Sequence, residues 1–304
     1  MNAKRIVLAL LTLGSALCAQ STGSGTPRLR KEMLVTTEWL AAHMHDPGLA
    51  VLSIGSTPEF YSKGHIPGAR QLLLSEIAVM RDGIPNELPP DATLEKVFAA
   101  AGVSNDSRII LYGERSNLLA ARAYFTLDYL GVAQKAALLD GGIEKWRAEQ
   151  RPLSTEATAT KPRQLTIAPQ RQVLIDTAGM HELAQKKRGS VTLIDARPAK
   201  EFTGEQLSED VQKPGHIPGA TSLYWMDMLV SRENPVLKPE AELRRMYEEA
   251  QAAPGRPLVT YCRTGMQSSF DYFVAKYLGY EPSMYDASFY EWSQKDLAAE
   301  TSPK

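Results

Sequence analysis

The sequence GHIPGA occurs twice in this chain, at residues 64–69 and at residues 215–220. The surrounding residues repeat as well: VLSIGSTPEF (51–60) parallels TLIDARPAKEF (192–202), and LLDGGIEKW (138–146) parallels MYDASFYEW (284–292). Two long copies, rather than many short ones, indicate two homologous domains and not a solenoid. The length of 304 residues agrees, because it exceeds what one hydrophobic core usually supports.

The repeat sets the expected domain boundaries. We expect one domain over 33–153, a linker over 154–172 and a second domain over 173–297. The linker is predicted from STEATATKPRQLTIAPQ (154–170), which is rich in Thr, Ala, Pro and polar residues.

The N-terminus has the pattern of a secretory signal peptide over 1–19. The positively charged MNAKR precedes an apolar run, 6–13, that is far shorter than the roughly 20 residues of a membrane span. Cleavage after Ala19 is favoured over lipid attachment at Cys18, because Leu17 is a poor residue for lipoprotein processing. We therefore expect a periplasmic or secreted protein without a membrane span.

Each repeat alternates apolar strand-like runs with helical patterns. In the second repeat, VTLID (191–195) and PLVTYC (257–262) are separated by KPEAELRRMYEEAQ (238–251), which has helical spacing. This alternation predicts an α/β fold in which each domain is a small parallel sheet with helices on both faces. Ligands of such sheets bind at the carboxyl ends of the strands.

Composition excludes several classes of function. The formal net charge is −1, with 34 basic and 35 acidic residues, so nothing favours binding to nucleic acid or anionic lipid. Five scattered His residues and two Cys residues show no metal-ligand spacing, so no metal and no other cofactor is expected. We expect a monomer.

The stretch YCRTGMQSS, residues 261–269, places Cys262 at the end of an apolar strand and just before a helix. Gly265 permits a tight curl in which backbone N–H groups point inward, and the helix adds the positive end of its dipole. Such a cradle favours the thiolate over the thiol. We therefore interpret Cys262 as a reactive nucleophile rather than an inert buried thiol.

An anion cradle around a cysteine suits two chemistries. A cysteine phosphatase needs an arginine six positions after the cysteine to grip phosphate, and here that position is Ser268. The shorter loop suits a persulfide, in which the cysteine carries one extra sulfur atom.

These motifs together resemble the tandem-domain rhodaneses, which are sulfurtransferases, over residues 33–295. The resemblance implies a catalytic C-terminal domain, an N-terminal domain without the nucleophile, and a site where the two domains meet. Alignment of the repeats without gaps places Glu114 opposite Cys262 and Gly55 opposite Arg197. His65 and His216 belong to the turn that both domains share, including the domain without the nucleophile. The resemblance therefore implies a structural role for both histidines.

The resemblance assigns roles to residues of the second repeat. The Cys262 thiolate attacks the outer sulfur of an anionic donor, and the persulfide passes this sulfur to cyanide or a thiol. Arg197, at the end of LIDAR, is expected to bind the donor, with a structural salt bridge as the alternative. Arg263 is expected to hold the donor's sulfonate oxygens, with a solvated side chain as the alternative. The rest of the donor-binding loop comprises Thr264, Gly265, Met266 and Gln267.

The same loop bears on the identity of the donor. Thiosulfate-type rhodaneses tend to have arginine and then lysine after the cysteine, and here Thr264 replaces the lysine. Mercaptopyruvate-type members tend to have Gly-Ser-Gly there, and they use a histidine that RQLLLSEIAVMRDGIPNELP (70–89) lacks. Thiosulfate is favoured. A 3-mercaptopyruvate sulfurtransferase and a non-catalytic persulfide carrier remain alternatives.

Overall fold

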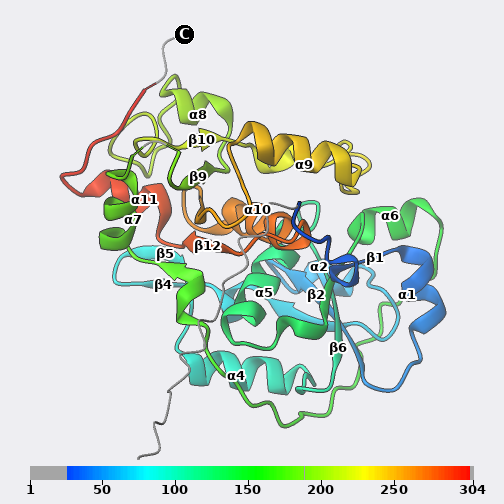
Figure 1. Cartoon of the computed structure of the whole chain (residues 1–304). Coiled ribbons are helices and arrows are strands. Elements are labelled where there is room, and N and C mark those ends of the chain that lie inside the picture. The colour runs from blue at the N-terminus through cyan, green and yellow to red at the C-terminus, as the bar shows by residue number, and fades with distance from the viewer. Residues whose placement is uncertain (1–25, 188, 302–304) are drawn as a thin grey trace, which may run out of the picture.

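The two repeats fold as two α/β domains in a computed structural model that describes residues 26–187 and 189–301. Figure 1 shows the first domain, in blue to green, below the second domain, in green to red. The expected signal peptide, 1–19, and Cys18 lie outside the described residues. No helix among the described residues is long and apolar enough to cross a membrane.

Each domain contains a five-stranded parallel sheet. The order in the first sheet is β1-β7-β6-β2-β3, and the order in the second, β8-β12-β11-β9-β10, repeats it strand for strand. The first-sheet strands are β1 (Leu34–Val35), β2 (Leu49–Gly55), β3 (Arg70–Leu73), β6 (Arg108–Gly113) and β7 (Ala136–Leu139). The second-sheet strands are β8 (Leu174–Ile175), β9 (Thr192–Asp195), β10 (Thr221–Ser222), β11 (Leu258–Tyr261) and β12 (Pro282–Tyr285).

Helices cover both faces of each sheet, as the sequence predicts. The first domain contains η1 (Lys31–Met33), α1 (Thr37–His43), α2 (Glu59–Ser62), α3 (Leu74–Ile77), α4 (Asp91–Ala100), α5 (Leu118–Tyr129), η2 (Ala133–Lys135) and α6 (Gly142–Ala148). The second contains η3 (Arg171–Val173), α7 (Thr177–Ala184), α8 (Ala199–Thr203), η4 (Trp225–Met228), α9 (Glu240–Glu249), α10 (Met266–Tyr277) and α11 (Ser288–Gln294). Trp146 of α6 and Trp292 of α11 are buried at equivalent positions of the outer layers.

Helices α5 and α10 join the two domains. They lie against each other in the middle of the molecule, and their aromatic side chains meet edge to face: Tyr124 with Phe273, and Phe125 with Tyr272. Each helix is buried nearly all round because one side packs on its own sheet and the other on the partner helix. One continuous apolar core therefore runs through both domains.

The duplicated GHIPGA turn has the same structural role in both domains. The N–H of Ile66 donates to the Tyr112 hydroxyl, and the N–H of Ile217 donates to the Tyr261 hydroxyl, both at 3.1 Å. His65 stacks on Tyr61 and His216 stacks on Phe202. The histidines thus pack the turn against its domain.

Two further segments connect the domains. Residues 155–170 contain no helix or strand and run along the first domain, where Arg163 and Ala168 donate to Ala99 and Leu130. The antiparallel hairpin of β4 (Val79–Arg81) and β5 (Ile84–Glu87) leaves the first domain and reaches the second, as Figure 1 shows. Asn86 of this hairpin contacts the loop that follows β11.

Candidate active site

Cys262 lies directly after β11, the middle strand of the second sheet, at the carboxyl edge that parallel sheets use for ligands. It is the free cysteine of the described residues, and only 1% of it is exposed. The side chain of Ser268, in the first turn of α10, donates a hydrogen bond to the Cys262 Sγ atom at 3.6 Å.

The loop from Cys262 to Gly265 curls around the hydroxyl of Ser288. Ser288 Oγ accepts from the N–H of Cys262 at 3.2 Å and from the N–H of Gly265 at 3.1 Å, and it donates to the Tyr285 carbonyl at 2.8 Å. Gly265 has φ +79°, and a Cβ there would lie 2.2 Å from Asp286 Oδ1, so only glycine fits. Ser288 was not identified from the sequence because it lies 26 residues from the cysteine, in an unremarkable helix start.

The N–H cradle expected from the sequence is therefore partly occupied. Two of its donors serve Ser288. The N–H groups of Arg263 and Thr264 donate to no other part of the chain that the structure describes. Those of Met266 and Gln267 belong to the first turn of α10, where N–H groups have no intrahelical acceptor. These four groups remain available to bind an anion.

Arg197 does not have the position expected of a donor-binding residue. Its guanidinium is 2% exposed, and its Nε and Nη2 atoms bond to the Asp195 carboxylate at 2.6–3.1 Å. Nη2 also donates to the Gly215 carbonyl, and the group lies over the Phe289 ring. The expectation of a donor-facing Arg197 is thus wrong, because burial commits its charge to Asp195. The bond from Arg197 to the Gly215 carbonyl ties the end of β9 to the second GHIPGA turn.

Arg263 lies at the mouth of the loop, beside a cavity of about 550 Å³. Its Nε is 3.7 Å from Asp210 Oδ2, and its side chain is 43% exposed. The cavity is lined by Arg263 together with Glu201, Gln206, Leu207, Ser208, Glu209 and Asp210. Arg263 is the cation among the residues that line this cavity, and it faces the carboxylates of Glu201, Glu209 and Asp210.

The first domain contributes to this site from the other side. Asn86 Nδ2 donates to the Thr264 Oγ1 atom at 2.9 Å. Arg122 of α5 is buried and forms a bidentate ion pair with Asp286, whose carboxylate lies against Gly265. Both domains therefore support the loop that carries Cys262.

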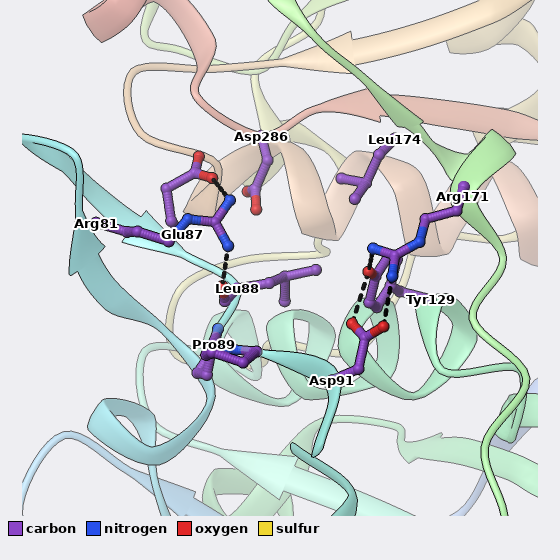
Figure 2. Close-up of a pocket in the computed structure, with 10 residues that line it drawn as sticks. Arg81, Glu87, Leu88, Pro89, Asp91, Tyr129, Arg171, Leu174 and Asp286 are labelled. Atoms are coloured by element: carbon purple, nitrogen blue, oxygen red, sulfur yellow. Dashed lines mark hydrogen bonds and ion pairs between the residues drawn. The ribbon is translucent and has the colours of Figure 1, made fainter. Parts of the chain in front are cut away.

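Behind Asp286, a cavity of about 330 Å³ opens between the domains. Figure 2 shows Arg81 on one side, bonded to Glu87 and to the Leu88 carbonyl, and Arg171 on the other, bonded to Asp91 and Tyr129. Burial, followed by the nearby Asp286 carboxylate, raises the pKa of Glu87 to about 7. In the part of the chain described, no group of His, Cys, Asp and Glu is arranged to hold a metal ion.

The corresponding loop of the first domain is closed. Tyr112 and Tyr261 hold equivalent bonds to the two turns, so the residue opposite Cys262 is Gly113. The gap-free alignment with Glu114 is wrong because the first loop is one residue longer: α5 begins five residues after Gly113, and α10 begins four after Cys262. A Cβ at Gly113 would lie 2.9 Å from Ala120 N and from Ile54 O, so no side chain fits.

Asn117 fills the centre of that closed loop. Its Oδ1 accepts from the Gly113 N–H at 3.1 Å, and its Nδ2 donates to the Leu139 carbonyl at 2.6 Å. Ser288 bonds to Cys262 and Tyr285 in the same way in the second domain. Gly142, the counterpart of Ser288, leaves room for the amide, because a Cβ there would lie 2.7 Å from Asn117 Oδ1.

A tandem pair of α/β domains, one with a cysteine at the start of a loop with unbonded N–H groups and the other with a closed loop, is typical of sulfur-handling proteins. Comparison with known proteins agrees. The sequence profile of the Rhodanese-like domain matches residues 36–149 and again residues 180–295. The chain belongs to the rhodanese family and is a tandem-domain sulfurtransferase of that family.

Two curated relatives match most of the chain. The "Sulfur carrier protein TtuD" of Thermus thermophilus is 33% identical over 277 residues, which cover 86% of this chain and 93% of the relative. The "Putative thiosulfate sulfurtransferase" of Mycolicibacterium smegmatis is 31% identical over 271 residues, or 86% of this chain and 95% of the relative. Among solved structures, SseA from Escherichia coli, described as a 3-mercaptopyruvate sulfotransferase, superposes with a TM-score of 0.74 at 25% identity, covering 84% of this chain and 97% of its own.

Proposed function

We propose that this protein transfers sulfane sulfur from thiosulfate to cyanide or a thiol through a persulfide on Cys262. The observation that supports this most directly is the surroundings of the Cys262 sulfur. It is buried, it accepts a hydrogen bond from Ser268, and the unpaired N–H groups of Arg263 and Thr264 follow it. Such surroundings suit a persulfide, whose terminal sulfur can accept these hydrogen bonds.

The reaction consists of two displacements. The Cys262 thiolate attacks the outer sulfur of thiosulfate, a sulfur–sulfur bond forms, and the original one breaks as sulfite leaves with the electron pair. Cyanide or a thiolate then attacks the outer sulfur of the persulfide, and the cysteine thiolate is restored. Hydrogen bonds from the loop stabilise the negative charge on the terminal sulfur.

Arg263 is the proposed donor-binding side chain. It is half exposed beside the cavity, and its charge is only loosely paired with Asp210 at 3.7 Å. Thr264, Gly265, Met266 and Gln267 would bind the donor through the loop backbone. Arg197 has no such role in this proposal, because its charge is bonded to Asp195. The pattern at the N-terminus supports a periplasmic or secreted location.

Intact-mass spectrometry tests the proposal. The purified protein is incubated with thiosulfate, and a gain of one sulfur atom on the Cys262 peptide is expected, followed by its loss on addition of cyanide. Thiocyanate should then accumulate over many turnovers. No gain of sulfur with thiosulfate would exclude it as the donor.

A persulfide carrier is the second candidate. It is favoured by the relative that is named a sulfur carrier protein and is 33% identical to this chain. The burial of Cys262 is also compatible with a stored persulfide that is protected from solvent. A carrier would take up one sulfur atom per chain and form at most one thiocyanate per chain. An enzyme would form many thiocyanate molecules per chain.

A further inference from the structure

One side chain of the first domain reaches the catalytic loop of the second. Asn86, in β5 of the hairpin, donates its Nδ2 hydrogen to the Thr264 Oγ1 atom at 2.9 Å. The two residues are 178 positions apart in the chain. Thr264 is the second residue after Cys262, at the centre of the loop.

The position of Asn86 is fixed on both sides. Its φ of +63° is in the left-handed region, which asparagine tolerates better than most residues. Its carbonyl accepts from Arg122 Nη2 at 2.5 Å, and Arg122 is in turn paired with Asp286 of the second domain. Asn86 is therefore held relative to the loop by a charge pair that crosses the interface.

The direction of this hydrogen bond has a consequence for Thr264. A hydroxyl has one hydrogen to donate and lone pairs to accept. Because Oγ1 accepts from Asn86, its hydrogen points away from Asn86. Among the described residues the Thr264 hydroxyl accepts from Asn86 and donates to no other group, so its hydrogen is left over at the centre of the loop.

We infer that Asn86 is a positioning residue that directs the Thr264 hydroxyl hydrogen to an anionic group bound at the loop. The first domain, which lacks a nucleophile, thereby sets the affinity of the second domain's site for anions. This inference rests on the proposed role of the Cys262 loop in binding an anionic donor, but its test does not require that the donor be thiosulfate.

The test compares two alkylating reagents that differ in charge. Iodoacetate is an anion and iodoacetamide is neutral, and both react with the Cys262 thiolate, which is followed by the mass of its peptide. The ratio of the two rates reports how well the loop binds a negative group next to the sulfur. The same protein is then tested for sulfur uptake from thiosulfate.

The variants are chosen for their backbone conformation. Asn86→Gly removes the side chain without strain at positive φ, and Asn86→Asp keeps the shape but offers only acceptors. Asp82→Gly is the matched control, because Asp82 is exposed, belongs to the same hairpin and also has positive φ, at +53°. Thr264→Val removes the hydroxyl, and Thr264→Ser keeps it.

We expect Asn86→Gly to lower the iodoacetate to iodoacetamide ratio about two- to tenfold, the effect of one hydrogen bond. Asn86→Asp should lower it further, because Thr264 must then donate to the new carboxylate. Asp82→Gly should leave the ratio unchanged. In the Thr264→Val background Asn86→Gly should have no further effect, and in Thr264→Ser its effect should persist.

Two results would overturn the inference. One is a ratio in Asn86→Gly equal to that in Asp82→Gly, and the other is an effect of Asn86→Gly that is undiminished in Thr264→Val. If Asn86→Gly does not fold, the effect of Asn86→Asp on the ratio is compared between the Thr264 protein and the Thr264→Val variant, and this comparison tests the inference. A shifted ratio without sulfur uptake from thiosulfate would refute the proposed donor and leave this inference standing.

Discussion

The guanidinium of Arg122 in the first domain and the carboxylate of Asp286 in the second form a bidentate ion pair, with distances of 2.5 Å and 2.9 Å. Arg122 is fully buried and Asp286 is 5% exposed. Removing one partner of such a pair leaves an uncompensated charge in the interior. The pair therefore fixes the two domains to each other directly beneath the Cys262 loop.

Arg122→Leu is expected to lower the free energy of unfolding by about 3–5 kcal/mol, because it leaves Asp286 buried without a partner. Arg122→Leu combined with Asp286→Asn should recover part of this loss. Urea denaturation measures the free energy of unfolding of the single and the double variant. Arg245→Leu, which breaks an exposed pair with Glu249, is the control and should cost less than about 1 kcal/mol. Similar losses for Arg122→Leu and Arg245→Leu would contradict the interpretation.

Cys262→Ser is expected to abolish sulfur transfer and to leave the fold intact. Serine is close to cysteine in size, but its hydroxyl is a poor nucleophile without a base. Thiocyanate formation and the melting temperature measure the two effects. Activity clearly above background in this variant would show that the reaction does not pass through a cysteine persulfide.

Gly113→Cys is expected not to create a second active site. A Cβ at this position would lie 2.9 Å from the backbone of Ala120 and Ile54, so the variant should be destabilised. Its sulfur uptake in a Cys262→Ser background should be zero by intact mass, and its melting temperature should fall. A stable double variant that takes up sulfur would show that the first loop can open.

Arg263→Gly is expected to lower kcat/KM for thiosulfate by about tenfold or more, because a compact dianion loses a charge-assisted contact of about 1.5–3 kcal/mol. Mercaptopyruvate carries a single carboxylate and should be affected less. Steady-state kinetics with both donors give the comparison. Equal losses would make Arg263 a general support of the loop, and no loss with thiosulfate would place it outside the site.

Asp271 of α10 is expected to make the stability of the fold depend on pH. Burial raises its pKa well above the usual range, and neither carboxylate oxygen has a hydrogen-bond partner among the described residues. In the unfolded chain it ionises near pH 4, so the stability associated with its neutral form is complete below that pH and is lost as the pH rises. The free energy of unfolding should fall by up to about 1.4 kcal/mol per unit above pH 4.

Asp271→Asn cannot ionise, so the difference in stability between the variant and the wild type should grow in the variant's favour from pH 4 to pH 7. Urea denaturation at several pH values measures it. Parallel stability curves for the two proteins would mean that Asp271 is ionised in the folded state.

The two-domain fold could be predicted from the sequence, because the repeated turns and the alternating apolar runs are local and periodic patterns that need no tertiary information. The sequence also predicted the position of Cys262 at a strand end. It failed at Arg197, because LIDAR shows where the arginine is but not that Asp195 binds it. Ser288 and Asn86 were missed because they reach the loop only through tertiary structure, with no spacing that a sequence reveals.

The alignment of Glu114 with Cys262 failed for a related reason. The helices α5 and α10 align without a gap, and so do the strands β6 and β11, but the two registers differ by one residue. Counting back from the helix gives Glu114, whereas the Tyr112 and Tyr261 hydrogen bonds identify Gly113. Only the structure shows on which side of the loop the extra residue lies.

The closed loop of the first domain cannot be converted into an active site by one substitution. A domain that had merely lost its cysteine could regain it by one substitution. Here a return would require the removal of one loop residue, a different residue at Asn117 and a serine at Gly142, and each change alone would disturb the packing of the others. The first domain thus has no room for a thiol of its own, and it contributes to the second domain's loop through Asn86 and Arg122.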